Sequence, residues 1–225
     1  GGIILPILAN LYLHYVLDLW FHKVYKPRGR GEACLIRYAD EFGCACQYQE
    51  EAERFSQELG ARLGKFGLEL SVEKTRVIPF SPREKLGKTS FDFLGFEFRW
   101  GRDRKGNPHL KRRTSRKRLR DSLKRFTEWC RVKCRYGREE WFRELNAKLR
   151  GYYNYYGVIG NYAGLKQFYD QAMRILDKWL NRRSQRRSQR RSYHWAGFRE
   201  LLREFQVEQP RIVGRPKTRM VAWGA

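Results

Sequence analysis

The sequence has no apolar run long enough to span a bilayer, although 41% of its 225 residues are hydrophobic. A membrane-spanning helix needs about 20 consecutive apolar residues. The basic segments that read as helices carry aromatic stripes typical of packing against other helices, not of a lipid-seeking face. We therefore expect no membrane partner, and one or two globular cores.

Cysteine is scarce and lacks the spacing of a metal site. The chain has five cysteines, an odd number, and no Cys-x-x-Cys pair. Cys44 and Cys46 share one face of a predicted strand, and Cys130 and Cys134 lie one helical turn apart. A zinc site would need two such pairs, or a histidine, to converge. With no secretory signal either, we expect free, mostly buried thiols in a reducing compartment.

Acidic residues are scarce in only one half of the chain. Residues 1–100 hold 14 Lys+Arg against 13 Asp+Glu, whereas residues 101–225 hold 34 against 11. Nearly all of the formal charge of +24 therefore lies in the second half. Such a field favours a polyanionic partner, chiefly nucleic acid.

The first half contains an acidic pair at the tip of a predicted hairpin, Asp40 and Glu41. Residues 34–37 and 42–46 are mainly apolar and read as two short strands, with about three residues left for the turn. Adjacent carboxylates repel each other unless a cation neutralises them, and Mg²⁺ prefers such hard oxygen ligands. The alternative is a solvated Asp-Glu turn.

The rest of the first half predicts an α+β fold. Apolar residues at helical spacing predict one helix after Pro6 and another over 52–66 that ends at Gly67. Residues 75–80 read as a strand, and residues 91–100 as a bent strand or hairpin around Gly95.

The second half predicts a compact helical domain. Residues 101–110 form a turn-rich connector, residues 111–209 repeat apolar side chains at helical spacing, and residues 210–225 form a short basic tail that we expect to be poorly ordered. The four apolar stripes begin at Leu119, Phe142, Leu165 and Trp195. Tyr152, Tyr153, Tyr155 and Tyr156 cannot all point inward, so we expect one or two of them to face RNA.

Six sequence blocks together resemble the group II intron-encoded reverse transcriptase/maturase family. The first four resemble its later reverse-transcriptase blocks, and the last two resemble its maturase domain. They occur in the order Gly1–Asn10, Arg37–Asp40, Phe66–Thr75, Phe91–Phe96, Gly151–Gly157 and Lys178–Gln185.

The resemblance implies a partial reverse-transcriptase palm over residues 1–100, of short antiparallel strands plus helices, followed by an all-α thumb/maturase domain. The complete protein would be an RNA-directed DNA polymerase, a nucleotidyltransferase that uses Mg²⁺ with an RNA template and a DNA primer. It would also bind its group II intron RNA and assist splicing. As the product of a mobile genetic element, it would form a ribonucleoprotein in the bacterial cytoplasm.

The resemblance also implies a role for the acidic pair as catalytic metal ligands. Asp40 matches a catalytic metal ligand of the family, and Glu41 stands where the family has a second aspartate. The family's fingers and a further metal-binding aspartate lie upstream of the block in which this sequence starts, so we expect a fragment, a truncated open reading frame or a piece of a longer product. Leu5 also replaces a usual serine. We therefore expect RNA binding with little or no polymerisation by this chain alone.

Further residues are carried over as nucleotide- or primer-binding. Gly1 and Gly2 open the first block, Lys74 lies in the block near the incoming triphosphate, and Leu94 and Gly95 lie in the block that holds the primer end. A solvated lysine and a purely structural turn are the alternatives for the last two blocks.

The basic residues of the second half are candidate RNA contacts, because guanidinium groups match phosphates in two-point contacts. One group is expected to open the first helix, and the other repeats every four residues as a ridge on a later helix. These residues are Lys111, Arg112, Arg113, Arg116, Lys117, Arg118, Arg182, Arg183, Arg186, Arg187, Arg190 and Arg191.

Three functions remain open from the sequence. The first is the end of a reverse transcriptase/maturase, and the second is a degenerate RNA-binding remnant or one half of a split enzyme that pairs with a fingers/palm polypeptide. The third is a condenser that binds nucleic acid by charge alone.

Overall fold

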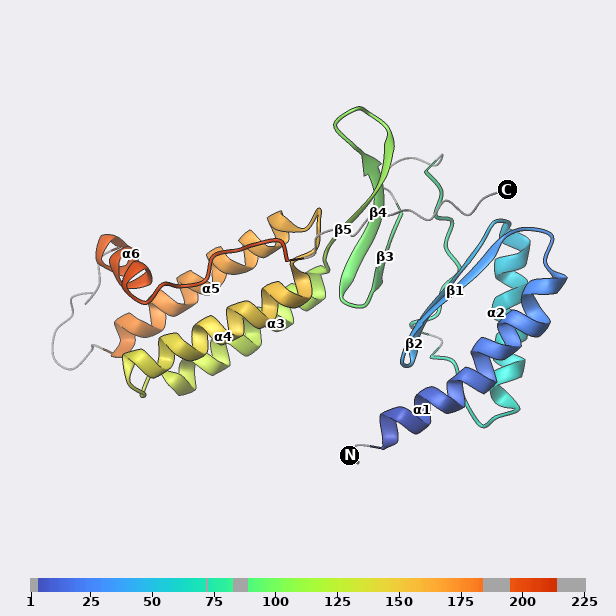
Figure 1. The fold of residues 1–225 in the computed structure, drawn as a ribbon, viewed down its shortest axis with the longest axis horizontal. Coiled ribbons are helices and arrows are strands. Elements are labelled where there is room, and N and C mark those ends of the chain that lie inside the picture. The colour runs from blue at the N-terminus through green and yellow to red at the C-terminus, as the bar shows by residue number, and fades with distance from the viewer. Residues whose placement is uncertain (1–3, 72, 83–88, 184–194, 214–225) are drawn as a thin grey trace. The chain divides into compact units, whose positions relative to one another are not determined.

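The computed structural model describes residues 4–71, 73–82, 89–183 and 195–213 (Figure 1). These form two compact units, one made of Gly1–Leu94 and Trp100–Pro108, the other of Gly95–Arg99 and His109–Ala225. The predicted α+β class is confirmed: antiparallel strands and helices come first, and the following part is mainly helical. No helix among the described residues is both long enough and apolar enough to cross a bilayer.

The first unit begins with a long helical segment. Helix α1 (Leu5–Leu13) has Pro6 in its first turn and is followed by two π-helical turns, His14–Asp18 and Phe21–Tyr25, and a 3₁₀ turn, Lys26–Arg28. Only the later part of this segment is buried, through Val16, Leu17, Trp20, Phe21 and Tyr25. Helix α1 itself buries no residue.

The predicted hairpin lies beside a second helix. Strands β1 (Ala33–Tyr38) and β2 (Glu41–Cys46) pair antiparallel with Tyr38 opposite Glu41, so the turn holds two residues and not three. Helix α2 (Gln49–Gly64) buries Phe55, Leu59 and Leu63 against the long helical segment. The chain leaves α2 through Gly67, whose φ of 66° is the left-handed conformation that glycine adopts without strain.

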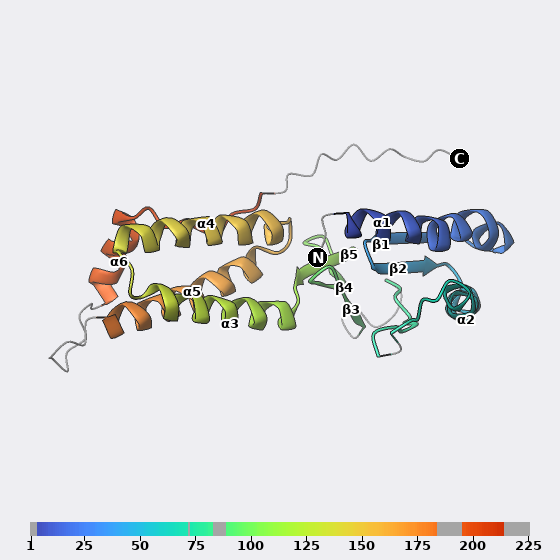
Figure 2. The ribbon, with the colours of Figure 1, turned by 90° about the horizontal axis from the view of Figure 1, so that it is seen from below.

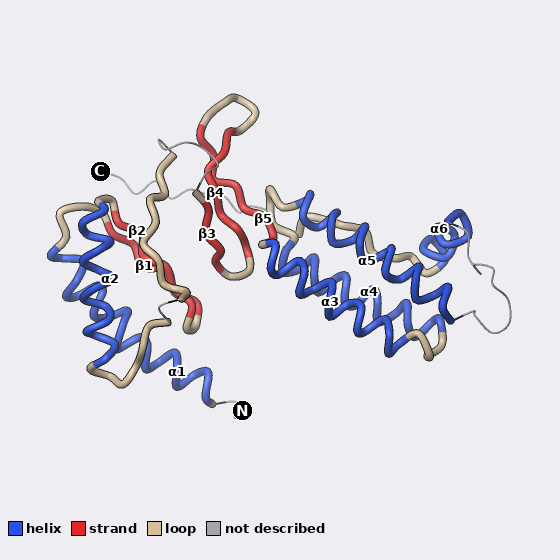
Figure 3. Tube along the Cα trace, turned by 180° about the vertical axis from the view of Figure 1, so that it is seen from behind, coloured by secondary structure: helices blue, strands red, loops and turns tan. Residues whose placement is uncertain are grey.

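One local prediction was wrong. Residues 75–80 form no strand, because no backbone ladder pairs with them among the described residues. The segment 101–110, expected to be a turn-rich connector, includes the end of one strand and the start of another. Strands β3 (Ser90–Phe93), β4 (Phe96–Arg102) and β5 (Pro108–Thr114) form a sheet in the order β3-β4-β5 (Figure 3). Only 103–107 turn between β4 and β5, where Asp103 Oδ1 accepts N–H bonds from Lys105 and Asn107.

The described part of the second unit contains four helices in addition to its strand residues. Helices α3 (Arg116–Lys133), α4 (Arg138–Tyr156) and α5 (Tyr162–Arg183) run along one another, and α6 (Trp195–Glu204) crosses one end of them (Figures 1 and 2). The predicted stripes supply most of its 17-residue buried core, which also takes in Trp141, Tyr153 and Met173. Of the four tyrosines 152–156, Tyr153 is fully buried and Tyr155 is 54% exposed.

A buried amide joins the end of β5 to the α4–α5 connection. Asn161 is fully buried, and its Oδ1 accepts the Thr114 N–H at 2.9 Å. Its Nδ2 donates to Thr114 Oγ1 at 2.9 Å and to the Tyr156 carbonyl at 2.8 Å. The described start of the predicted tail is also held, because the Val213 N–H donates to the Gly157 carbonyl at 2.7 Å.

Candidate functional site

The acidic pair lies at the exposed tip of the β1–β2 hairpin. Ala39 and Asp40 form the turn, and Glu41 is the first residue of β2. Ala39 has a φ of 53°, a left-handed conformation that costs a residue with a Cβ about 1–2 kcal/mol. Strain of this kind persists only where neighbouring groups hold the backbone in place.

Arg37 is the group that holds this turn. Its Nη1 donates to the Ala39 carbonyl at 2.9 Å and to Asn10 Oδ1 of α1 at 2.9 Å. Its Nε and Nη2 donate to the two carboxylate oxygens of Asp18 at 2.8 and 2.7 Å. One guanidinium thus fixes the turn to two points of the long helical segment, through a bidentate pair of the strongest kind.

The pair with Arg37 favours the ionised form of the Asp18 carboxylate. Hydrogen bonding to Arg37 holds the pKa of Asp18 below its ordinary value of 3.8, against partial burial, which acts in the opposite direction. The same bond raises the pKa of Arg37. The clamp is therefore fully charged at neutral pH.

Glu41 has a partner of its own. Its Oε2 accepts the backbone N–H of Leu94 at 3.3 Å. Leu94 and Gly95 form the two-residue turn between β3 and β4, with φ angles of 50° and 78°. At Gly95 a side chain would be strained by this φ, and its Cβ would come within 3.1 Å of the Tyr156 hydroxyl.

The carboxylates fit a magnesium ion only in part. Mg²⁺ commonly binds through one or two carboxylates together with water and substrate phosphates, and the exposed tip offers oxygen donors of that kind. However, no third His, Cys, Asp or Glu joins Asp40 and Glu41 in a cluster within the described part of the chain. One carboxylate oxygen of Glu41 already accepts the Leu94 N–H, so Asp40 is the better candidate ligand.

The other predicted nucleotide-binding residues are less informative. Lys74 lies on an exposed turn after α2, where its N–H donates to the Ser71 carbonyl at 3.0 Å. Gly1 and Gly2 lie outside the described residues.

The first basic cluster, Lys111, Arg112 and Arg113, was predicted to open a helix. It lies on strand β5 instead. The Arg113 guanidinium is paired with Glu97 of β4 at 2.7 Å, and Arg112 Nε donates to the Ile159 carbonyl at 3.3 Å. Both arginines therefore have partners within their own unit. Lys111 is exposed.

The next three cations occupy the first turn of α3. Ser115 caps this helix by accepting the Arg118 N–H at 3.4 Å, and Arg116, Lys117 and Arg118 follow with no acidic residue in the turn. None of these three side chains forms an ion pair within the described ranges. Because a helix N-terminus carries partial positive charge, cations there are destabilising, by about 0.3–1 kcal/mol each. An anionic partner would reverse that cost.

The second basic cluster is only partly described. Arg182 is exposed near the end of α5, with its guanidinium carbon 5.0 Å from the centre of the Trp179 ring, and Arg183 is the last residue of α5. Arg186, Arg187, Arg190 and Arg191 lie outside the described residues. The predicted ridge therefore stays a prediction.

Sequence reasoning missed the Arg37 clamp. A signal was present, because Asn10, His14 and Asp18 are spaced four apart and are the polar residues of an otherwise apolar segment over 3–21. This spacing places them on one side of a helix. Arg37 meets Asn10 and Asp18, and His14 Nδ1 lies 3.3 Å from Asp18 Oδ2.

Asp40 is thus exposed at the tip of a hairpin that packs beside α2 and the long helical segment. Residues 1–98 match the protein family described as reverse transcriptase (RNA-dependent DNA polymerase). This part of the chain is thus a reverse-transcriptase domain, and it contains Asp40, Glu41, Lys74, Leu94 and Gly95. No curated protein matches the chain.

Proposed function

We propose that this chain is the C-terminal portion of a group II intron reverse transcriptase/maturase. Residues 1–100 form part of the polymerase palm, and the helical unit binds the intron RNA. The observation that carries the proposal is the reverse-transcriptase match over residues 1–98, followed in the same chain by the strongly basic helical part. The six sequence blocks support the intron-specific assignment.

Asp40 is the residue we propose as metal ligand in the complete polymerase. When bound, Mg²⁺ supplies charge stabilisation at the reacting phosphate oxygens. The chain's own residues hold the ligand in position. Arg37 fixes the turn that presents Asp40, and Glu41 connects the hairpin to the Leu94 turn. With so few acidic ligands assembled among its described residues, the isolated chain is expected to bind RNA without efficient cDNA synthesis.

The RNA-binding proposal is tested at the first turn of α3. Replacing Arg116, Lys117 and Arg118 with glutamine should lower the slope of log affinity against log salt by about two to three phosphate contacts. The matched control replaces Arg131, Arg135 and Lys166, which are exposed cations of the same unit, and leaves the slope nearly unchanged.

The two variants should also differ in stability. Removing cations from the positive end of α3 raises the melting temperature of the first variant, whereas Arg131 lies in the last turn, where a cation is favourable. Equal slopes for both variants would show that only net charge matters, as in a condenser. Robust Mg²⁺-dependent primer extension by the isolated chain would contradict the predicted lack of polymerisation.

Helix α1 favours a second candidate, one half of a split enzyme. Its apolar side chains are exposed, with Ile4, Leu5 and Ile7 each about two-thirds accessible. An apolar surface of this kind usually marks a protein interface. If a separately produced fingers/palm polypeptide co-purifies with this chain and restores cDNA synthesis that Asp40→Ala abolishes, the split enzyme is supported. If no such polypeptide binds, the candidate is rejected.

A further inference from the structure

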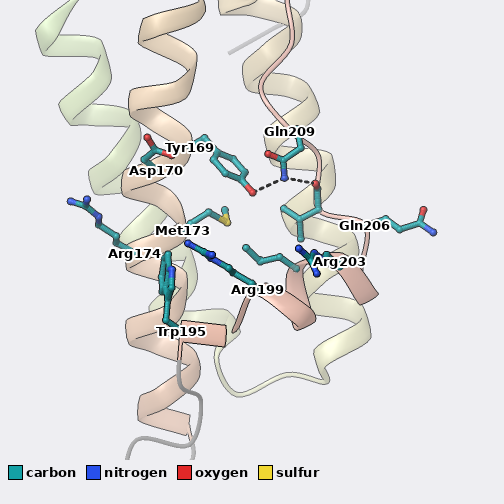
Figure 4. A pocket seen from close by; sticks show the side chains of 11 residues that line it. Tyr169, Asp170, Met173, Arg174, Trp195, Arg199, Arg203, Gln206 and Gln209 are labelled. Atoms are coloured by element: carbon teal, nitrogen blue, oxygen red, sulfur yellow. Dashed lines mark hydrogen bonds between the residues drawn. The ribbon is translucent and has the colours of Figure 1, made fainter. Parts of the chain in front are cut away.

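The helical unit contains a cavity that the proposed function does not use. It measures about 460 Å³ and lies between α5, α6 and residues 206–209 (Figure 4). Its floor is apolar, since Met173 and Val207 are 3% and 5% exposed. A volume of this size is in the range of small-molecule sites, which run to about 300–1,000 Å³.

One wall of the cavity is a half-exposed aromatic ring. Trp195, the first residue of α6, is 47% exposed and packs on one side against Phe198, with ring centres 5.4 Å apart. In Figure 4 its indole stands at the edge of the cavity beside Met173. An accessible flat ring over an apolar floor is a stacking surface for a nucleic-acid base.

The charge around the cavity favours an anion. Arg174 of α5 and Arg199 and Arg203 of α6 line it, against the single carboxylate of Asp170. Among the described residues these three arginines form no ion pair. The guanidinium of Arg199 lies over the Trp195 ring, with its carbon 5.7 Å from the ring centre (Figure 4). Guanidinium groups beside an aromatic face suit a phosphate next to a stacked base.

A fixed amide adds a hydrogen-bonding group. Gln209 Nε2 donates to the Tyr169 hydroxyl at 2.8 Å and to the Val207 carbonyl at 3.3 Å. These two bonds orient the side chain and leave its oxygen as an acceptor for a base N–H. The cavity therefore combines a stacking face, an acceptor and cations.

We propose that this cavity receives one unpaired nucleotide of a bound RNA. The base stacks on Trp195 above Met173, and Arg174 and Arg199 contact the neighbouring phosphates. A base within a duplex is stacked and cannot enter, so the site discriminates loops, bulges and ends from paired RNA. The proposal rests on the proposed RNA-binding function and adds a specific site to it.

The test compares two RNAs of equal length and charge, a hairpin with an unpaired loop and a fully paired duplex, by fluorescence anisotropy. Trp195→Ala should weaken binding of the looped RNA about 5- to 30-fold, as expected for loss of one stacked base, and leave duplex binding unchanged. Trp195→Phe keeps a ring and should retain most of the affinity. The matched control is Tyr162→Ala, which removes an exposed aromatic residue of α5 outside the cavity and should change neither affinity.

Each outcome separates this site from the general RNA-binding proposal. If the unmodified chain binds neither RNA, the proposed function fails. If it binds both but Trp195→Ala, like Trp195→Phe, changes the affinities for the looped RNA and the duplex by the same factor, the cavity assignment is overturned. Binding of adenosine monophosphate as tight as that of the looped RNA would assign the cavity to a free nucleotide and overturn the RNA assignment.

Discussion

The two units of the molecule differ in how much of their surface they bury and in how they carry charge. Among the described residues, the core of the helical unit has 17 buried residues, whereas the core of the first unit has nine. Nearly all of the excess positive charge belongs to residues 101–225, and residues 1–100 are close to neutral. The helical unit thus combines the larger described core with nearly all of the excess positive charge. The first unit carries the candidate ligand Asp40 on a small hairpin that is held by a few polar bonds.

The largest expected effect on the free energy of unfolding comes from comparing a buried leucine of the helical unit with an exposed leucine of the first unit. Leu149 of α4 is fully buried, and Leu149→Ala should lower the free energy of unfolding by about 2–5 kcal/mol through lost contacts and a cavity. Leu8→Ala makes the same chemical change in α1, where the side chain is 54% exposed, and should cost less than about 0.5 kcal/mol in the isolated chain. Urea denaturation followed by circular dichroism measures both. A large cost at Leu8 would show that α1 is buried, and the contrast would fail.

The next largest effect is expected at the clamp of the first unit. Arg37→Gln removes the bidentate pair with Asp18 and should cost about 1.5–3 kcal/mol, because charged hydrogen bonds are lost and a carboxylate is left without its partner. Hydrogen exchange of amides in residues 33–46 measures the loss locally. Arg76→Gln makes the same charge change at an exposed residue of the same unit and should leave exchange unaltered. Equal protection in both variants would show that the turn does not depend on Arg37.

The clamp also predicts a pH dependence. Because the pKa of Asp18 is lowered in the folded state, its contribution to stability is present above pH 3.8 and is lost as the pH falls through the folded value. Hairpin protection should therefore be constant from pH 7 to about 4 and decrease below that. Asp18→Asn should be less protected at pH 7 and show a weaker decrease. Identical acid profiles would place the titrating group elsewhere.

The two units were also unequal in how far the sequence predicted them. Helical spacing located the buried faces of the second unit, for instance through Leu145, Leu149 and Leu176, because a 3.6-residue period is a local property. Strand β5 was not predicted, because Pro108–Thr114 has only one strongly apolar residue. It forms a strand by pairing with β4. Conversely, residues 75–80 are rich in strand-forming residues but find no pairing partner among the described residues.

The same distinction applies to the candidate site. The tip at Asp40 was predictable, because two short apolar strands flank an acidic turn. Its supports were not, since Asp18 lies 19 residues from Arg37 and Leu94 lies 53 residues from Glu41. Contacts at such separations depend on how helix and hairpin pack. Sequence spacing therefore located the chemical group but not what positions it.

The smallest expected effect tests whether the tip stores strain at all. Ala39→Gly removes the Cβ from a left-handed residue, and the relief exceeds the entropy that glycine adds to the unfolded chain, so hairpin stability should rise by about 0.5–1 kcal/mol. Ala45→Gly makes the same change at an exposed, extended residue of β2, where only the entropy term acts, and should lower stability by a similar amount. Opposite shifts in amide exchange would show that the backbone, and not side-chain loss, decides the result. If both variants lose protection, the left-handed backbone of Ala39 does not cost the hairpin stability.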